Sequence, residues 1–340
     1  MAVIGYWLSS EEHTPNDLVE YARRAEELGF THIMISDHYH PWVDAQGHAP
    51  FVWSVIGGIA SVTKKVTLGT GVTCPTIRTH PAIIAQAAAT AAAMMPGRFI
   101  LGLGTGENLN EHILGDKWPP FQERLEMLEE SIEIMRKLWE GKITSHRGEY
   151  YTVENARIYT LPEQPIPIYI AAAGTDTAEV AGRVADGFIN TSPEKEPLEA
   201  FEQAGGAGKE KHGQFTCCWA ETEQEAVRTA YEIWPNGGLK GPLSQELPLP
   251  QHFEEAVKMV SEEDIAESVV CGPDPEPYLA KIREYADAGF THIYLHQIGP
   301  DQEGFFRFYQ RELAPKLGPV TSEETKTQRR KGRKGPAKSS

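Results

Sequence analysis

The stretch EELGFTHIMISDHYHP, residues 26–41, decides the fold because the chain carries a near copy of it, ADAGFTHIYLHQIGP, at residues 286–300. Each copy reads as the end of a helix, a glycine that stops the helix, and Phe-Thr-His-Ile leading into a buried strand. A β/α unit that recurs near both ends of the chain is expected when one unit is repeated around a ring.

Six further apolar segments read as strands, and helical segments alternate with them. With the strands at residues 31–36 and 292–296 they make eight: Val3–Leu8, Val66–Val72, Phe99–Gly104, Ile168–Ala173, Gly187–Asn190 and Phe215–Ala220. The clearest helices are Pro15–Leu28, Phe51–Thr63, Pro81–Met95 and Phe121–Trp139. Eight strands alternating with helices predict a (β/α)8 TIM barrel. The alternative is an open, doubly wound sheet.

Three stretches interrupt this alternation. Lys142–Thr160 alternates polar and apolar residues around a glycine and predicts a β-hairpin insertion. Glu194–Lys211 and Pro235–Gln251 are rich in glycine, proline and charge and are interpreted as long βα loops. In a barrel such loops lie over the carboxyl ends of the strands and influence substrate choice.

The composition limits the classes of protein that are possible. The chain has 340 residues, 40% of them hydrophobic, and a net charge of −16, which argues against a body that binds nucleic acid. It has no long apolar run and no basic, apolar leader, so we expect a cytoplasmic protein without a membrane segment. Residues 1–320 are expected to form one barrel domain. Residues 321–340 form a basic tail that is expected to be disordered, or to serve as an arm for RNA or another polyanion.

Polar residues follow the second predicted strand, where barrel enzymes carry their chemistry. Asp37 precedes His38, and a carboxylate beside a histidine can raise its basicity and fix its tautomer. Trp42 offers a flat wall. The alternatives are a structural pair of histidines, or a metal-dependent hydrolase that uses His38 and His40 with Asp37 and His48.

Small residues follow three other strands. Gly102–Glu111 contains a G-x-G-x-G pattern with Glu107 and Asn110, which suits a planar heterocycle or, alternatively, only a tight turn before a helix. Gly69–Thr76 would let a ligand lie against the chain. Ala171–Asp176 precedes a helix and could bind an anion through backbone N–H groups. The alternative for both is close helix packing.

These segments together carry a resemblance to a known family. SDHYHPW, GHAPF, LGTGV, IIAQAAAT, LGLGTGE followed by NLNE, and YIAAAG resemble the deazaflavin-dependent branch of the luciferase-like flavin barrels, in particular the coenzyme F420-dependent glucose-6-phosphate dehydrogenase group. The resemblance implies a dehydrogenase that transfers a hydride between a hydroxyl-bearing carbon of a small substrate and carbon 5 of coenzyme F420. It also implies a homodimer and no metal.

The resemblance assigns a role to individual residues. His38 would be the general base, Glu107 would serve the pyrimidine edge of the coenzyme, Trp42 would close the site, and Glu11 would be an acid near the substrate. The remaining cofactor positions would be Asp37, Gly71, Val72, Cys74, Thr105, Gly106, Asn110, Ala173, Gly174 and Thr175. A non-proline cis peptide is expected at Gly71–Val72, and backbone N–H groups of Ala173, Gly174 and Thr175 would hold phosphate.

Thr191 and Lys195 would bind the substrate, and here the chain departs from the family. Glu194 and Glu267 stand near positions where the sugar-phosphate enzymes place cations. A phosphate dianion would be repelled there, so we expect an alcohol, lactol or sugar rather than glucose 6-phosphate. The alternatives in other classes are an FMN-dependent monooxygenase of the same superfamily and a non-catalytic relative that binds a cofactor.

Overall fold

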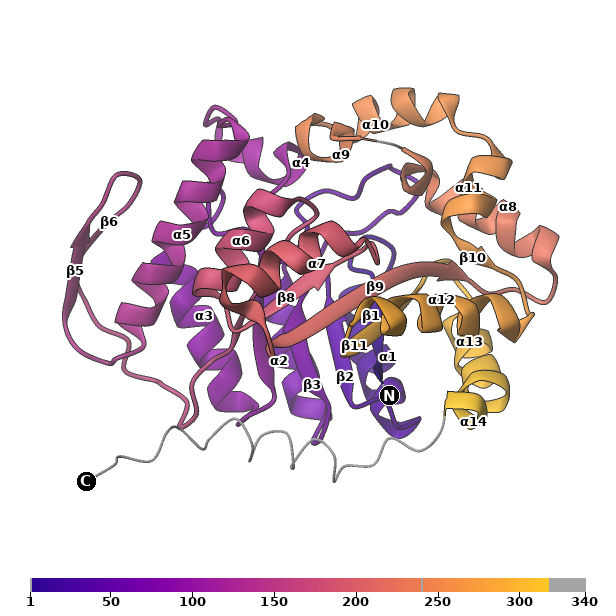
Figure 1. Ribbon diagram of the computed structural model, residues 1–340, viewed down its shortest axis with the longest axis horizontal. Coiled ribbons are helices and arrows are strands. Elements are labelled where there is room, and N and C mark those ends of the chain that lie inside the picture. The colour runs from indigo at the N-terminus through magenta and orange to yellow at the C-terminus, as the bar shows by residue number, and fades with distance from the viewer. Residues whose placement is uncertain (1, 240, 318–340) are drawn as a thin grey trace.

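The computed structural model describes residues 2–239 and 241–317, in which parallel strands close into a barrel inside a layer of helices (Figure 1). β11 pairs with β1 and β8 pairs with β9, so the ring is closed. A two-residue strand, β10 (Val270–Cys271), adds to β9 outside the ring. The predicted (β/α)8 barrel is confirmed. Its strands are β1 (Val3–Leu8), β2 (His32–Ile35), β3 (Thr67–Thr70), β4 (Phe99–Leu103), β7 (Ile168–Ala171), β8 (Gly187–Asn190), β9 (Glu210–Cys218) and β11 (His292–Gln297).

Capping residues explain where the first helix begins and ends. Thr14 caps the first helix by accepting from the N–H of Asp17, Pro15 takes its first position, and Gly29 follows it with a φ of +93°. The longer helices are α1 (Pro15–Glu27), α2 (Val52–Val62), α3 (Pro81–Met94), α5 (Phe121–Leu138), α6 (Thr175–Val184), α8 (Glu223–Ile233) and α12 (Pro275–Ala288). The shorter helices are α4 (Asn108–Glu111), α7 (Lys195–Phe201), α9 (Leu243–Glu246), α10 (Pro250–Ala256), α11 (Glu262–Ser268), α13 (Gln302–Phe308) and α14 (Ala314–Leu317).

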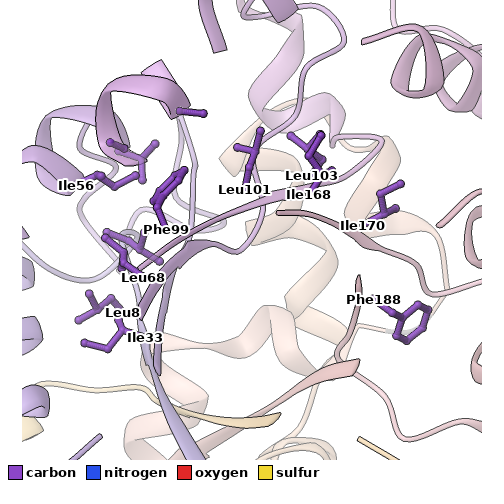
Figure 2. Close-up of a cluster of buried hydrophobic side chains, with 14 of the residues drawn as sticks. Leu8, Ile33, Ile56, Leu68, Phe99, Leu101, Leu103, Ile168, Ile170 and Phe188 are labelled. Atoms are coloured by element: carbon purple, nitrogen blue, oxygen red, sulfur yellow. The ribbon is translucent and has the colours of Figure 1, made fainter. Parts of the chain in front are cut away.

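Alternate side chains of each strand enter two different cores. Leu8, Ile33 and Leu101 belong to the large cluster between the strands and the helices, part of which Figure 2 shows together with Ile56 of α2. Their neighbours Trp7 and Met34 belong to a smaller cluster inside the barrel. This alternation follows from the two-residue period of a strand, and it leaves both ends of the barrel interior available for polar groups.

The insertion predicted at Lys142–Thr160 is a hairpin, in which β5 (Thr144–Arg147) pairs antiparallel with β6 (Thr152–Ala156). It projects from the side of the barrel beyond α5 (Figure 1). The hairpin is fastened by Glu130 of α5, which accepts hydrogen bonds from the backbone N–H groups of residues 149–151.

One predicted loop and the start of one predicted strand need correction. Glu194–Lys211 is not a long loop, because it contains α7, whose apolar Leu198 and Phe201 are buried against the barrel. Proline in the first turn does not break such a helix. The strand predicted at Phe215 begins five residues earlier, at Glu210, because the polar residues before Phe215 face the barrel interior or its edge.

Pro235–Gln251 does lie over the carboxyl ends of the strands, as predicted, but as short helical turns rather than as open loop. In Figure 1 α9 and α10 lie at the same end of the barrel as α4. None of the described helices is long and apolar enough to cross a membrane. The basic tail predicted at 321–340 lies outside the described residues.

Candidate active site

A cavity of about 410 Å³ opens at the carboxyl ends of the barrel strands and is called the carboxyl-end cavity below. Thirteen of the residues predicted for the site line it together: Glu11, Asp37, His38, Trp42, Gly71, Val72, Cys74, Thr105, Gly106, Glu107, Asn110, Ala173 and Thr191. They meet because the carboxyl ends of parallel strands share one end of the barrel. Gly174, Thr175 and Lys195 are not part of this lining, since the first two begin α6 and Lys195 begins α7.

His38 lies between two carboxylates. Its Nε2 atom is 3.3 Å from Oε1 of Glu11 and 3.5 Å from Oε2 of Glu107. Its Nδ1 atom lies 3.1 Å from the carbonyl oxygen of His40, which can only accept a hydrogen bond. A hydrogen on Nδ1 satisfies this carbonyl and leaves Nε2, which faces the two carboxylates, to take up a proton; Nδ2 of Asn110 also lies 3.3 Å from Nδ1.

The two carboxylates change the basicity of this histidine. Burial by itself would lower the pKa of His38, but Glu11 and Glu107 together raise it above its usual range. Burial and the nearby Glu11 raise the pKa of Glu107, although His38 opposes them. The pKa of Glu11 is lowered despite burial, because His38 and the Ser36 hydroxyl, which donates to Oε2 at 2.7 Å, stabilise the carboxylate.

Asp37 does not orient His38, contrary to the interpretation of their adjacency. Its Oδ1 accepts from Nη2 of Arg78 at 3.0 Å and its Oδ2 accepts from the hydroxyl of Thr73 at 2.8 Å. Arg78 also donates through Nε to Glu111 at 3.3 Å. Neighbouring residues at a strand end point in different directions, so sequence adjacency did not predict contact. Arg78 and Glu111 were missed by the sequence analysis.

Asn110 positions the segment that follows the second strand. Its Oδ1 accepts from the backbone N–H groups of Tyr39 and His40, at 2.8 and 3.2 Å. Its Nδ2 is therefore the donor, and it donates to Oε2 of Glu107 at 3.0 Å. One amide thus connects the loop that carries His38 to the carboxylate on its other side.

One wall of the carboxyl-end cavity is built from small residues. The peptide bond between Gly71 and Val72 is cis, as predicted. A Cβ at Gly71 would overlap the Trp7 ring, and Gly106 has a φ of +84° with Cys74 directly beside it. Only glycine fits at these two positions, so backbone forms the surface there and a flat group can lie against it.

The lining also contains polar residues that were not predicted from the sequence. The Nδ2 atom of Asn190 and the Nε2 atom of His296 are buried and have no hydrogen-bond partner within the described structure. Burial lowers the pKa of His296 to about 4, so its ring is neutral near pH 7. Trp234 packs edge-on against His296, with ring centroids 4.8 Å apart. A signal existed for His296, because it ends the strand of the second Phe-Thr-His-Ile motif, at the position that Ser36 holds after the first.

The described lining of the cavity is uncharged or acidic apart from its histidines. Of the residues described along its lining, none is a lysine or an arginine, and neither Glu194 nor Glu267 belongs to it. The predicted repulsion of phosphate by those two acids is therefore not the feature that the cavity presents. Lys240, between the lining residues Asn236 and Gln245, is outside the described residues.

The histidine pair of the hydrolase hypothesis is separated. Nδ1 of His40 lies 2.9 Å from the carbonyl oxygen of Leu109, so that ring nitrogen is engaged as a donor rather than directed at His38. Among the described residues, only one group of three has metal-ligand atoms close together, and it contains Glu210, His212 and His292 at the other end of the barrel.

Known proteins share this fold and much of this sequence. The profile of the luciferase-like monooxygenase family matches residues 1–292. The F420-dependent glucose-6-phosphate dehydrogenase of Segniliparus rotundus is 38% identical over 328 residues, covering 92% of this chain and 97% of that protein. The enzyme of the same name from Amycolatopsis mediterranei is 37% identical, with coverages of 93% and 99%. An F420-dependent secondary alcohol dehydrogenase, solved with an F420–acetone adduct, superposes with a TM-score of 0.87 at 29% identity, over 94% of this chain and 99% of that one.

Proposed function

This chain belongs to the luciferase-like monooxygenase family and is an F420-dependent dehydrogenase, and we propose that it oxidises the alcohol carbon of a small, uncharged substrate with His38 as the general base. The observation that carries the substrate class is the absence of lysine and arginine from the described lining of the carboxyl-end cavity. The role of His38 as general base is supported by its place in this cavity together with the other residues predicted for the site.

The carboxyl-end cavity fits the coenzyme on its own geometry. Gly71, Gly104, Gly106 and the alanines at 171–173 supply small residues to the lining, which also includes Asn190, whose buried Nδ2 has no hydrogen-bond partner within the described structure. We infer that the ring lies on this surface and that the backbone of Ala173 begins the phosphate site. Gly174 and Thr175 remain proposals for that site, at the amino end of α6. The deazaflavin, when bound, accepts a hydride at carbon 5.

The protein's task is then to remove a proton and hold the charge that results. Nε2 of His38 takes the hydroxyl proton of the substrate while Nδ1–H remains on the carbonyl oxygen of His40. Glu11, with a lowered pKa, stays ionised and stabilises the imidazolium at 3.3 Å. Glu107, with a raised pKa, is suited to hold a proton at the coenzyme edge.

Aromatic residues close the cavity around the substrate. The Trp42 ring lies 5.0 Å from that of His38, centroid to centroid, and packs on Phe253 of α10. Trp234 and the neutral His296 also line the cavity, with their ring centroids 4.8 Å apart. Such walls exclude water from the reacting atoms and bind hydrocarbon, which agrees with an uncharged alcohol, lactol or free sugar.

The test is F420 reduction, followed by its loss of visible absorbance, with secondary alcohols, free sugars and glucose 6-phosphate. A charge-assisted hydrogen bond contributes about 1.5–3 kcal/mol. A site without two such bonds to phosphate should therefore have a kcat/KM for glucose 6-phosphate that is lower by about 10²–10⁴. We expect an uncharged alcohol to exceed glucose 6-phosphate by such a factor. Equal efficiency with glucose 6-phosphate would overturn the substrate class but not the role of His38.

Calorimetric titration separates the dehydrogenase from the FMN-dependent alternative. We expect F420 to bind and FMN and NADP to bind weakly or not at all. Tight binding of FMN with none of F420 would contradict the proposed use of the carboxyl-end cavity.

We also infer a homodimer that buries the apolar face of α2 and α3. Phe51, Ile83 and Met94 are 62%, 58% and 48% exposed there and line one shallow hollow. Clustered apolar exposure of this kind marks an interaction surface, and twofold association of identical faces is the commonest arrangement. Light scattering should give a dimer for the wild type and a monomer for Ile83→Asp. A dimeric Ile83→Asp would place the interface elsewhere.

A further inference from the structure

The amino ends of the barrel strands hold a second set of polar side chains, which we call the amino-end cluster: Glu210, His212 and His292. Glu210 and His212 are two residues apart on β9 and therefore face the same side of the sheet. His292 on β11 is the residue paired with His212 in the parallel register. One oxygen of Glu210 and one ring nitrogen of each histidine all lie within 4.8 Å of one another.

We propose that the amino-end cluster binds one zinc ion, which joins β9 to β11 at the end of the barrel opposite the carboxyl-end cavity. Two imidazoles and one carboxylate are ligands that zinc accepts in proteins. The distance between Nε2 of His212 and Oε2 of Glu210 is 3.4 Å, close to the roughly 3.3 Å that separates two ligands of a tetrahedral zinc ion.

The hydrogen bonds around the cluster orient its ligands. Nδ1 of His212 lies 3.0 Å from the hydroxyl of Tyr294, and Nδ1 of His292 lies 3.0 Å from the hydroxyl of Thr291. With both Nδ1 atoms occupied, Nε2 is the ligand atom of each ring. The hydroxyl of Tyr169 donates to Oε2 of Glu210 at 2.6 Å. Partners of this kind fix ring orientation and tautomer in metal sites.

The cluster is also accessible. The Glu210 side chain is 42% exposed, and with His32 and Tyr169 it lines a hollow of about 280 Å³. The ring of His32, on β2, is 4.5 Å from that of His292, centroid to centroid. His32 and His292 occupy the same place in the two Phe-Thr-His-Ile motifs, so the repeated β/α unit delivers both imidazoles to this end of the barrel.

The test uses the full chain without an affinity tag, treated with a chelator and titrated with zinc chloride by calorimetry. We expect one equivalent to bind to the wild type, and at least 100-fold weaker binding in Glu210→Gln and His292→Gln. Cobalt chloride should give the visible absorption bands of a four-coordinate ion in the wild type and lose them in both variants. F420 affinity should be unchanged in both variants, because they do not touch the carboxyl-end cavity.

His146→Gln is the matched control. Nε2 of His146 lies 3.0 Å from Oε1 of Glu130, so it is also a histidine–carboxylate pair, but it has a single imidazole. The control should bind zinc as the wild type does. Wild-type affinity in Glu210→Gln, or no zinc and cobalt binding by the wild type, would overturn the proposal and leave the cluster a hydrogen-bonded network. Because Glu210 is partly exposed, its variant remains informative if His292→Gln fails to fold.

Discussion

The two ends of the barrel both place histidines beside carboxylates, yet the two sets have opposite proton affinities. In the carboxyl-end cavity two carboxylates, Glu11 and Glu107, face one imidazole and raise the pKa of His38. In the amino-end cluster one carboxylate, Glu210, faces two imidazoles, and the pKa of each histidine is lowered. Burial lowers the pKa of all three histidines, and only at His38 do nearby carboxylates outweigh it.

The strands β9 and β11 reach both ends of the barrel, because they carry the amino-end cluster and also Thr216 and His296, which line the carboxyl-end cavity. The interior side chains of β11 are His292, Tyr294 and His296, in order from the amino end to the carboxyl-end cavity. Tyr294 separates the two histidines with a large apolar ring inside the barrel core. The two ends can therefore be perturbed one at a time.

The largest expected effect is on kcat, when one histidine is replaced at each end in turn. His38→Ala should lower kcat by about 10²–10⁴ with little change in F420 affinity, because the base acts on the substrate proton. His292→Gln should leave kcat close to that of the wild type. Steady-state F420 reduction and calorimetry measure both. A His38→Ala variant that turns over normally would remove His38 from the proposed mechanism.

The second largest effect is expected on the free energy of unfolding, when the cation beside the carboxyl-end cavity is removed. Arg78 is buried between Asp37 and Glu111, so Arg78→Met leaves two buried carboxylates without their cation. We expect a loss of about 3–5 kcal/mol in the free energy of unfolding, measured in urea at pH 7. The control is Arg183→Met, which breaks an exposed pair with Glu129 and should cost at most about 1 kcal/mol. Equal losses would mean that the buried position of Arg78 is not what matters.

The amino-end cluster should make stability depend on pH in chelated protein. His292 titrates at about 3 in the folded chain and near its usual value when unfolded. The unfolded state therefore binds more protons between pH 6.5 and 3, and the folded state loses stability as pH falls through this window. His292→Gln should recover roughly 2–3 kcal/mol of that loss by pH 4.5, since each pKa unit corresponds to 1.36 kcal/mol. If the free energy of unfolding fell equally in the wild type and the variant between pH 7 and 4.5, the lowered pKa of His292 would be contradicted.

A smaller effect is expected from removing one of the two carboxylates near His38. As a base His38 must be neutral, so kcat/KM should fall as pH drops below its raised pKa. Glu107→Gln removes one cause of that rise, and the acid limb of the profile should move to lower pH. A shift to higher pH would mean that Glu107 does not act on His38 through its charge.

The smallest effect is expected at the basic tail. Deletion of residues 321–340 should leave F420 affinity, turnover and melting temperature nearly unchanged, since its composition offers almost no apolar surface to bury. A clear fall in melting temperature would show that the tail contributes to the stability of the acidic barrel.

Local patterns predicted much of the molecule. Thr14, Pro15 and Gly29 predicted both ends of α1, and the repeated Phe-Thr-His-Ile motif predicted β2 and β11. The charge and proline content near Glu194 predicted a loop. The structure has helix α7 there, because Leu198 and Phe201 are buried.

For the site, the sequence by itself determined which segments supply it, because every parallel strand delivers its carboxyl end to the same end of a barrel. His38, Trp42 and Glu107 could be selected on that ground alone. Tertiary structure decided which side chains touch: Glu11 rather than Asp37 beside His38, Arg78 between Asp37 and Glu111, and His212 opposite His292. These contacts join residues that are 27 to 80 positions apart, and only closure of the ring fixes the register and direction that bring them within a few ångströms.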